Sequence, residues 1–142
     1  MTLRLVFDTN VMVAALRSTR GASRALLTLA LGRDFVLLMS VPLMIEYEAV
    51  LTRAEHMEAA GASPQDVHAI LDALASVIEP VRLAYLWRPV LPDQQDDMVL
   101  ETAANGQADW LVTLNLQHFK PVDRMFGIEV LLPGQAVARL RR

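Results

Sequence analysis

Four carboxylates and one amide are candidates for a metal-binding or catalytic site: Asp8, Glu46, Asp96, Asp97 and Asn115. Carboxylate and amide oxygens are hard ligands, of the kind that Mg²⁺ and Mn²⁺ prefer in proteins. A divalent cation held by carboxylates lowers the pKa of a bound water and stabilises a phosphoryl transition state. The residue types therefore predict hydrolysis of a phosphodiester, provided that the fold brings them together.

The composition leaves few other metal ligands. The chain has 142 residues, no cysteine and three histidines, His56, His68 and His118. The lack of cysteine excludes disulfides, thiolate catalysis and cysteine-ligated metal sites. The histidines are dispersed along the sequence, and we expect them at the surface or in packing. Any metal is therefore expected to be bound through oxygen.

The length and the apolar content predict one folded domain over residues 1–142. Hydrophobic residues make up 54% of the chain and charged residues 20%, so there is enough apolar surface to offset the entropy of folding. No apolar run reaches the roughly 18–20 residues that cross a bilayer. Without cysteine or a recognisable export signal, we expect a cytoplasmic protein with no membrane association.

The elements that must position these side chains alternate along the chain. Short apolar runs predict strands at 3–7, 35–39, 80–86, 110–113 and 128–132. Helical patterns cover 11–16, 22–31, 42–53, 64–78, 96–105 and 133–142, and residues 88–97 begin as a loop that contains Pro89 and Pro92. This alternation predicts an α/β fold, a three-layer sandwich with a short parallel sheet between helices.

In a parallel sheet the crevice at the carboxyl ends of the strands is where chemistry is expected. Asp8 ends the first predicted strand, although an acid there could simply cap the next helix. Thr113 and Asn115 end the fourth strand and offer neutral oxygens to a metal's water shell or to a phosphate. These three side chains are therefore expected at the same edge of the sheet.

The remaining acids lie on helices. Glu46 shares a helical stripe with apolar Leu43 and Val50, where a carboxylate is costly unless it is paired or binds a metal. A salt bridge at the edge of the stripe is the alternative. Asp96 shares a helical stripe with the apolar Val99, Leu100 and Ala103, so it is expected to face the sheet. A register shift of one residue would put Asp97 in its place, and the helix dipole alone also favours acids there.

In order and spacing, these motifs resemble the PIN-domain signature over nearly the whole chain. The segments that carry the likeness are Phe7-Asp8-Thr9-Asn10, Ile45-Glu46-Tyr47, Asp96–Glu101, Leu111–Asn115, Asn115–Phe119 and Phe126–Pro133. The sequence is similar to the branch of that family described as toxin components of toxin–antitoxin systems. The resemblance implies a PIN fold and an endoribonuclease that uses Mg²⁺ or Mn²⁺ and leaves a 5′-phosphate and a 3′-hydroxyl.

The resemblance also assigns roles. It implies that Asp8, Glu46 and Asp96 are the catalytic, metal-binding acids and that Thr9 and Asn10 support the first of them. Thr113 would support the fourth position of the motif. Many PIN nucleases carry an acid there, whereas this chain has Asn115, which weakens the expected affinity for metal and puts a second metal ion in doubt. Asp97 is a further candidate ligand, and Asp93 or Glu101 could also compensate for the missing charge.

The expected partners are an RNA substrate, an antitoxin protein and a second copy of the chain. Twelve of the 13 basic residues are arginine, which favours bidentate contacts with phosphate. Arg17, Arg20 and Arg24 follow the Asp8 loop and are candidate contacts with RNA phosphates. The alternative is that they are solvated helix residues or bind an acidic partner. The mean hydropathy of +0.32 is high for a small monomer and favours a homodimer.

Two other functions fit part of the pattern. A PIN-like domain without activity, serving as an interaction module, is supported by Asn115. A receiver-like signalling module that binds Mg²⁺ would need a lysine at a later strand end, and Lys120 lies past a helical turn instead. The net charge of −3 argues against binding of RNA. This argument loses its force if three of the acids belong to a cation site. A divalent ion there would bring the nominal charge to about −1 by simple addition.

Overall fold

Five parallel strands form one sheet in the order β3-β2-β1-β4-β5. The computed structural model describes residues 2–86, 91 and 94–142, and the side chains of 94 and 95 are not described. The strands are β1 (Arg4–Phe7), β2 (Val36–Met39), β3 (Glu79–Pro80), β4 (Trp110–Val112) and β5 (Glu129–Leu131). Because all five run the same way, their carboxyl ends meet at one edge. Most of the predicted loop at 88–93, with Pro89, Pro92 and Asp93, lies outside the described residues.

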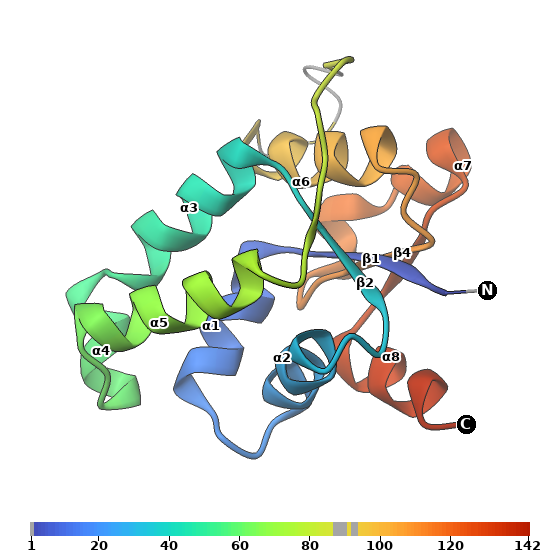
Figure 1. The fold of residues 1–142 in the computed structure, drawn as a ribbon. Helices are drawn as coiled ribbons and strands as arrows, with labels where there is room; N and C mark the ends of the chain where they lie inside the picture. Colours follow the sequence, from blue (N-terminus) through green and yellow to red (C-terminus); the bar gives the residue numbers. More distant parts are fainter. Residues whose placement is uncertain (1, 87–90, 92–93) are drawn as a thin grey trace.

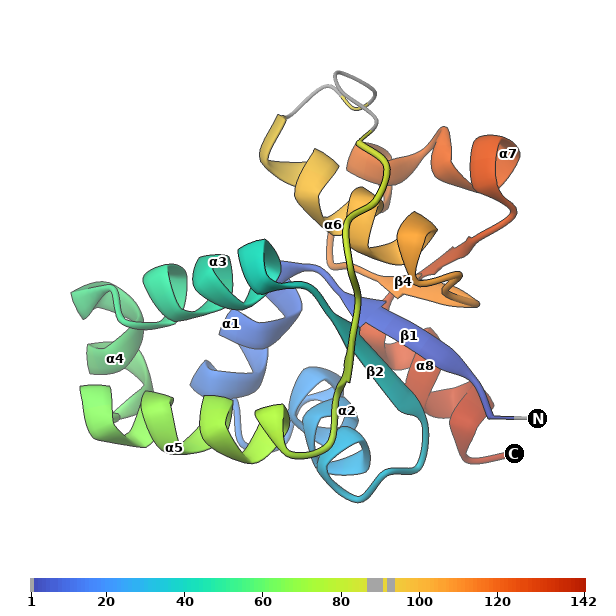
Figure 2. The same ribbon diagram turned by 45° about the horizontal axis from the view of Figure 1, so that its top comes forward.

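Helices cover the sheet on both faces, which confirms the predicted three-layer α/β sandwich (Figure 1). The helices are α1 (Thr9–Arg17), α2 (Ala22–Leu31), α3 (Val41–Leu51), α4 (Ala54–Ala60), α5 (Pro64–Ala75), α6 (Gln94–Asn105), α7 (Val122–Phe126) and α8 (Pro133–Leu140), with the 3₁₀ turn η1 (Leu116–Phe119). Figure 2 shows α6 on one face of β1 and β2 and the pair α2 and α8 on the other. The central strand β1 is therefore buried from both sides.

The strands form because their side chains are apolar on both faces. Leu5, Val6 and Phe7 of β1 are fully buried, as is Leu111 of β4. Such continuous apolar runs are typical of parallel strands that helices cover on both sides. The ring of Phe7 meets Phe35 edge to face at 5.9 Å. The packing of the core thus fixes the position of the end of β1, and the next residue is Asp8.

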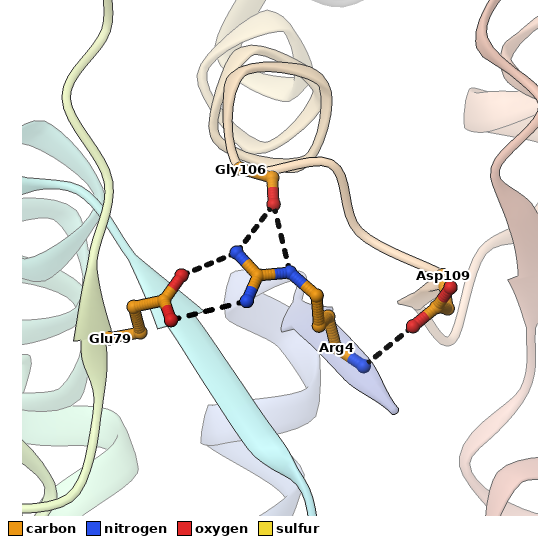
Figure 3. A network of polar contacts seen from close by, with 4 residues as sticks. All are labelled: Arg4, Glu79, Gly106 and Asp109. Atoms are coloured by element: carbon orange, nitrogen blue, oxygen red, sulfur yellow. Dashed lines mark hydrogen bonds and ion pairs between the residues drawn. The ribbon is translucent and has the colours of Figure 1, made fainter. Parts of the chain in front are cut away.

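Arg4 connects three segments at the opposite end of β1 (Figure 3). Its guanidinium forms a bidentate ion pair with Glu79 of β3, with Nη1 donating to Oε1 at 3.1 Å, and its Nε and Nη2 donate to the carbonyl of Gly106 at 3.2 and 2.8 Å. Its backbone nitrogen donates to Asp109 at 2.8 Å. Arg4 therefore holds the end of α6 over the sheet. Its hydrogen bond to Glu79, and to a lesser extent its charge, keeps the pKa of Glu79 below its ordinary value.

The glycine after α6 allows this close approach. A Cβ on Gly106 would lie 2.9 Å from side-chain atoms of Leu38 and Val81 and from the carbonyl of Thr102. No methyl group fits at that distance without a shift of the backbone or of the core. Gly106 thus lets the last turn of α6 pack directly on β2.

The predicted strand at 80–86 is wrong beyond its first residue, since β3 is only Glu79–Pro80. Val81 still donates its backbone nitrogen to the Met39 carbonyl of β2 at 2.9 Å, and the backbone further along is bound by a side chain instead. Asn105 accepts from the backbone nitrogens of Ala84 and Tyr85 at 3.1 and 3.0 Å and donates to the Tyr85 carbonyl at 2.8 Å. The strand therefore stops because α6 supplies its hydrogen bonds.

Other differences concern helix ends and short helices. Ser40 accepts from the backbone nitrogen of Leu43 at 3.3 Å and begins α3, which ends at Leu51 and not near residue 53. The helix predicted at 64–78 ends at Ala75. The short elements α4, η1 and α7 were not predicted, because runs of four to seven residues show too little periodicity. In the part of the chain that the structure describes, no helix is long and apolar enough to cross a membrane.

Candidate active site

Asp8 lies directly after β1 and only 6% of its surface is exposed. Its backbone nitrogen continues the pairing with β4 by donating to the Val112 carbonyl at 2.9 Å. Its carboxylate makes no capping hydrogen bond to α1, so the capping interpretation does not explain it. Instead, the hydroxyl of Thr113 donates to Asp8 Oδ2 at 2.7 Å. Asp8 is therefore oriented across the sheet by Thr113, the residue that follows β4.

A chain of contacts runs from Asp8 to Asp96 on α6. Thr113 Oγ1, which donates to Asp8, accepts from the backbone nitrogen of Asn115 at 3.0 Å. The Asn115 amide Nδ2 lies 2.8 Å from His118 Nε2, and His118 Nδ1 lies 2.9 Å from Asp96 Oδ2. The structure thus links four of the predicted site residues through one histidine. The hydrogen-bonded pair Asp8 and Thr113 is separated by 105 residues in sequence.

Asp96 and Asp97 are both buried in the first turn of α6, but in different surroundings. Asp97 is fully buried and its Oδ1 accepts from the backbone nitrogen of Leu91 at 3.1 Å. Asp96 is 8% exposed and meets His118 at the carboxyl edge of the sheet. Both also benefit from the positive end of the α6 dipole. The arrangement favours Asp96 as the ligand and Asp97 as a residue that holds the preceding chain.

Glu46 lines a cleft of about 570 Å³ together with Thr9 and Asn10, the two residues that follow Asp8. Its helical neighbours Leu43, Tyr47 and Val50 are buried, as its stripe predicts, and Glu46 itself is half-buried. The cleft is lined by Thr9, Asn10, Val13, Ala14, Arg17, Ser18, Glu46, Val50, Arg53, His56 and Leu114. Glu46 therefore shares a cleft with the two residues after Asp8.

The loop that carries Asp8 is tied to its neighbours by side chains. Asn10 Oδ1 accepts from the backbone nitrogen of Leu114 at 3.2 Å, which joins the start of α1 to the end of β4. The hydroxyl of Tyr47 donates to the Phe7 carbonyl immediately before Asp8. Burial, and after it the negative charge of Asp8, raises the pKa of Tyr47 well above its ordinary value. The phenol therefore stays protonated and remains a donor.

Tyr47→Phe is expected to lower the free energy of unfolding by about 1–3 kcal/mol, because it leaves the buried Phe7 carbonyl without this donor. Urea denaturation of both proteins measures the difference. The exposed Tyr85 provides the control, since Tyr85→Phe removes a hydroxyl at the surface and should change stability little. Equal losses for the two variants would contradict this role of Tyr47.

The three arginines that are candidate contacts with RNA phosphates differ in their surroundings and hydrogen bonds. Arg17 is exposed and lines the cleft with Glu46, and its Nη1 lies 3.5 Å from His56 Nδ1. Arg20 is exposed and is not among the described residues that line the cleft. Arg24 donates to the Ala15 and Leu16 carbonyls at 2.6 and 3.3 Å. Arg24 therefore completes the carboxyl end of α1, so Arg17 is the best placed of the three to meet a ligand.

The donors fit Mg²⁺ or Mn²⁺. Asp8 and Asp96 are buried carboxylates at one edge of the sheet, and the neighbouring Thr113 and Asn115 add neutral polar groups. Within the described residues, no group of three or more histidine, aspartate or glutamate side chains is arranged to hold a metal. Mg²⁺ does not require one, because it usually keeps several waters and binds through one or two carboxylates. Glu46 would then act from the cleft that it shares with Thr9 and Asn10.

Sequence reasoning missed three residues of this region. His118 was expected at the surface or in packing, yet it contacts both Asp96 and Asn115. Its spacing of three from Asn115, a single turn of 3₁₀ helix, was the available signal. Arg53 and His56, which line the cleft, carry no signal of their own in the sequence. They reach the cleft only because α3 and α4 fold back beside α1.

Comparisons with known proteins agree with this fold. Residues 4–117 match the PIN domain family. Among solved structures, the chain is similar to VapBC2 from Rickettsia felis bound to a DNA fragment from their promoter, at 16% identity and a TM-score of 0.62, covering 92% of this chain and 98% of that one. It is also similar to FitAcB from Neisseria gonorrhoeae, at 20% identity and a TM-score of 0.59, with the same two coverages. A search of curated proteins gave no match.

Proposed function

Because the chain belongs to the PIN domain family, we propose that it is an endoribonuclease dependent on Mg²⁺ or Mn²⁺ and the toxin of a toxin–antitoxin pair. The observation that carries this proposal is the chain of contacts between Asp8 and Asp96. It places two buried carboxylates of separate elements at the carboxyl edge of the sheet. Buried carboxylates at one edge are unfavourable together unless a cation offsets their charge.

Each residue of the region has a role in this proposal. Asp8 and Asp96 hold the cation, Glu46 binds from the cleft, and Asn115 contributes through its amide oxygen or a water. Thr113 orients Asp8 by the hydrogen bond already described. Asn10 and Tyr47 hold the backbone on both sides of Asp8. A bound divalent cation would supply an activated water and stabilise negative charge on the scissile phosphate.

The reaction that these groups support is hydrolysis of an RNA phosphodiester in line. The oxygen of water bonds to phosphorus while the bond from phosphorus to O3′ breaks. One proton of the water is lost from the attacking oxygen and O3′ takes up a proton. The products are a 5′-phosphate and a 3′-hydroxyl, as the family resemblance implies. The side chains named here need only hold the phosphate and the water in line, which is itself a large part of such catalysis.

Removal of divalent cations is expected to abolish cleavage of RNA. Treatment with EDTA should stop the cutting of a 5′-fluorescent RNA strand, and excess Mg²⁺ or Mn²⁺ should restore it. An Asp8→Asn protein purified in parallel controls for contaminating ribonucleases. Cleavage that persists at the same rate in EDTA would contradict the metal-dependent reaction. Binding of Mn²⁺ without any cleavage of RNA would instead favour the inactive PIN-like module.

We expect Arg17 and Arg53 to bind phosphates of the RNA strand in the cleft beside Glu46. The double variant Arg17→Ala/Arg53→Ala should bind RNA more weakly, and each lost contact should reduce the salt dependence by roughly 0.7 in log–log slope. Fluorescence anisotropy at several salt concentrations measures both, in an Asp8→Asn background that leaves the strand intact. Arg20→Ala removes one exposed charge outside the cleft and is the matched control for each single variant, Arg17→Ala and Arg53→Ala. An equal effect of Arg20→Ala would mean that only net charge matters.

The proposed protein partners are an antitoxin and a second copy of the chain. One of the similar structures is described as VapBC2 bound to a DNA fragment from their promoter, which is a fact about that protein alone. In this chain, Val41 and Ile45 are 73% and 63% exposed on one side of α3. Exposed apolar side chains of this kind favour association. Light scattering after size-exclusion chromatography, with and without the protein encoded next to this one, tests both partners.

A further inference from the structure

A second cleft, of about 580 Å³, lies where the starts of α2 and α8 meet the end of α1. Figure 2 shows α2 and α8 side by side. The cleft is lined by residues 21–23 and 132–135 and by Ala14, Ser18 and Leu114. The last three residues also line the first cleft, which contains Glu46, so the two clefts adjoin. We propose that the second cleft binds one nucleobase of an RNA strand whose phosphate lies in the first.

The two adjoining clefts differ in charge, and this difference matches the two ends of a nucleotide. The first is lined by Arg17, Arg53 and Glu46, whereas no described residue that lines the second carries a charge. A phosphate would be poorly stabilised in the second cleft, because it would lose water there without gaining a counterion. The face of a base is uncharged and gains from burial against apolar walls. The inference rests on the proposed function, because it takes RNA as the ligand.

The second cleft contains one buried hydroxyl that suits the edge of a base. Ser23, in the first turn of α2, is 5% exposed, and its hydroxyl has no hydrogen-bond partner among the described residues. A hydroxyl both donates and accepts, as the edges of nucleobases do. Small-ligand sites typically have volumes of roughly 300–1,000 Å³ and combine apolar walls with a few polar groups that orient the ligand. A purely apolar ligand would leave Ser23 without a partner, which favours a base.

Leu114 connects the second cleft to the candidate active site. Its side chain is 48% exposed and belongs to both clefts. Its backbone nitrogen donates to Asn10 Oδ1 at 3.2 Å, and the preceding residue, Thr113, donates to Asp8 at 2.7 Å. The wall between the clefts is therefore fixed relative to Asp8. A base bound beyond Leu114 would select which phosphodiester of the strand reaches the proposed cation site.

Gly134→Leu tests the second cleft by filling part of it. A Cβ on Gly134 would meet no atom within 4 Å, and leucine is a better helix former than glycine, so the fold should be kept. We expect this variant to bind a 5′-fluorescent RNA strand about 10-fold more weakly, because one base loses its buried contacts. Fluorescence anisotropy in the Asp8→Asn background measures the affinity. Ala138→Leu adds the same side chain at an exposed position one turn further along α8 and is the matched control.

A second variant and a modified strand identify the group that binds. Ser23→Ala should weaken binding by about 2–10-fold, which corresponds to the loss of one hydrogen bond. RNA strands that each lack one base, at successive positions, should reveal one position where the base contributes to affinity. In Gly134→Leu the loss of that base should have no further effect. Gly134→Leu should also keep the salt dependence of the Asp8→Asn protein, because no phosphate contact is lost.

Equal binding of RNA by Gly134→Leu and Ala138→Leu would overturn the proposal, as would strands in which no missing base changes the affinity. It would also be overturned if Gly134→Leu bound RNA normally but no longer associated with the protein encoded next to this one, since the cleft would then receive a protein. If the wild type cleaves no RNA with Mn²⁺, the proposed function fails and the base site fails with it. A wild type that cleaves, beside a Gly134→Leu protein with unchanged RNA affinity, would overturn only the base site.

Discussion

Asp8→Asn is expected to reduce cleavage of RNA by about 10³-fold or more, because a loss of several kcal/mol of cation-based stabilisation corresponds to that factor. The asparagine has the same shape and its oxygen can still accept from Thr113, so the fold should be kept. Initial rates on a 5′-fluorescent RNA at saturating Mg²⁺ measure the effect, and thermal unfolding checks the fold. Calorimetry with Mn²⁺ should show weaker binding in parallel.

Glu48→Gln is the matched control for Asp8→Asn. Glu48 also loses one negative charge in this exchange, but it is exposed on α3 and belongs to none of the contacts described at the site. Its variant should cleave RNA at the wild-type rate. An Asp8→Asn protein that cleaves as fast as Glu48→Gln would contradict the assignment of Asp8 as a ligand, whatever the fate of the other residues.

Asp96→Ala and Asp97→Ala are expected to impair different properties, the cleavage rate in the first and the stability in the second. Asp96→Ala should lose about 10²-fold or more of the cleavage rate and keep its stability, because it removes a ligand and relieves repulsion between buried carboxylates. Asp97→Ala should lower the free energy of unfolding by about 1–3 kcal/mol, because the backbone nitrogen of Leu91 loses its buried acceptor. Cleavage rates at 25 °C and urea denaturation of both variants provide the two measurements.

The outcome decides whether Asp96 or Asp97 is the ligand, a choice that the sequence leaves open because it does not fix the register of the helix. If Asp97→Ala abolishes cleavage while it remains folded and Asp96→Ala does not, then Asp97 is the ligand of the pair. The structural reason to expect the opposite is that Asp97 is fully buried against the chain before α6, whereas Asp96 reaches His118 at the edge of the sheet. Loss of stability in both variants would assign both residues to the framework of α6.

Much of the fold can be read from the sequence because its signals are local. Leu5, Val6 and Phe7 form an apolar run that is followed at once by Asp8, and Ser40 with Pro42 begins a helix by its own chemistry. Such patterns depend on a few adjacent residues. They are sufficient to predict a parallel sheet between helices and to predict that Asp8 and Thr113 share its carboxyl edge, which the hydrogen bond between them confirms.

The hydrogen-bond partners of several backbone groups come from segments far apart in sequence. These contacts could not be predicted. The early end of β3 follows from Asn105, some 20 residues further on, and Arg24 is engaged by carbonyls of the preceding helix. In both cases a polar side chain satisfies backbone groups that the local pattern assigns to a strand or leaves to solvent. The periodicity of a segment carries no information about which distant donor will reach it.

By itself the sequence determined the fold class, the family resemblance and a set of acids expected at the carboxyl edge of the sheet. Only the tertiary structure decided how those acids are held, with Asp96 and Asp8 connected through His118, Asn115 and Thr113. The physical reason is that burial and hydrogen-bond direction belong to the packed molecule. A histidine that is unremarkable in the sequence acquires two partners because η1 lies between the end of β4 and the first turn of α6.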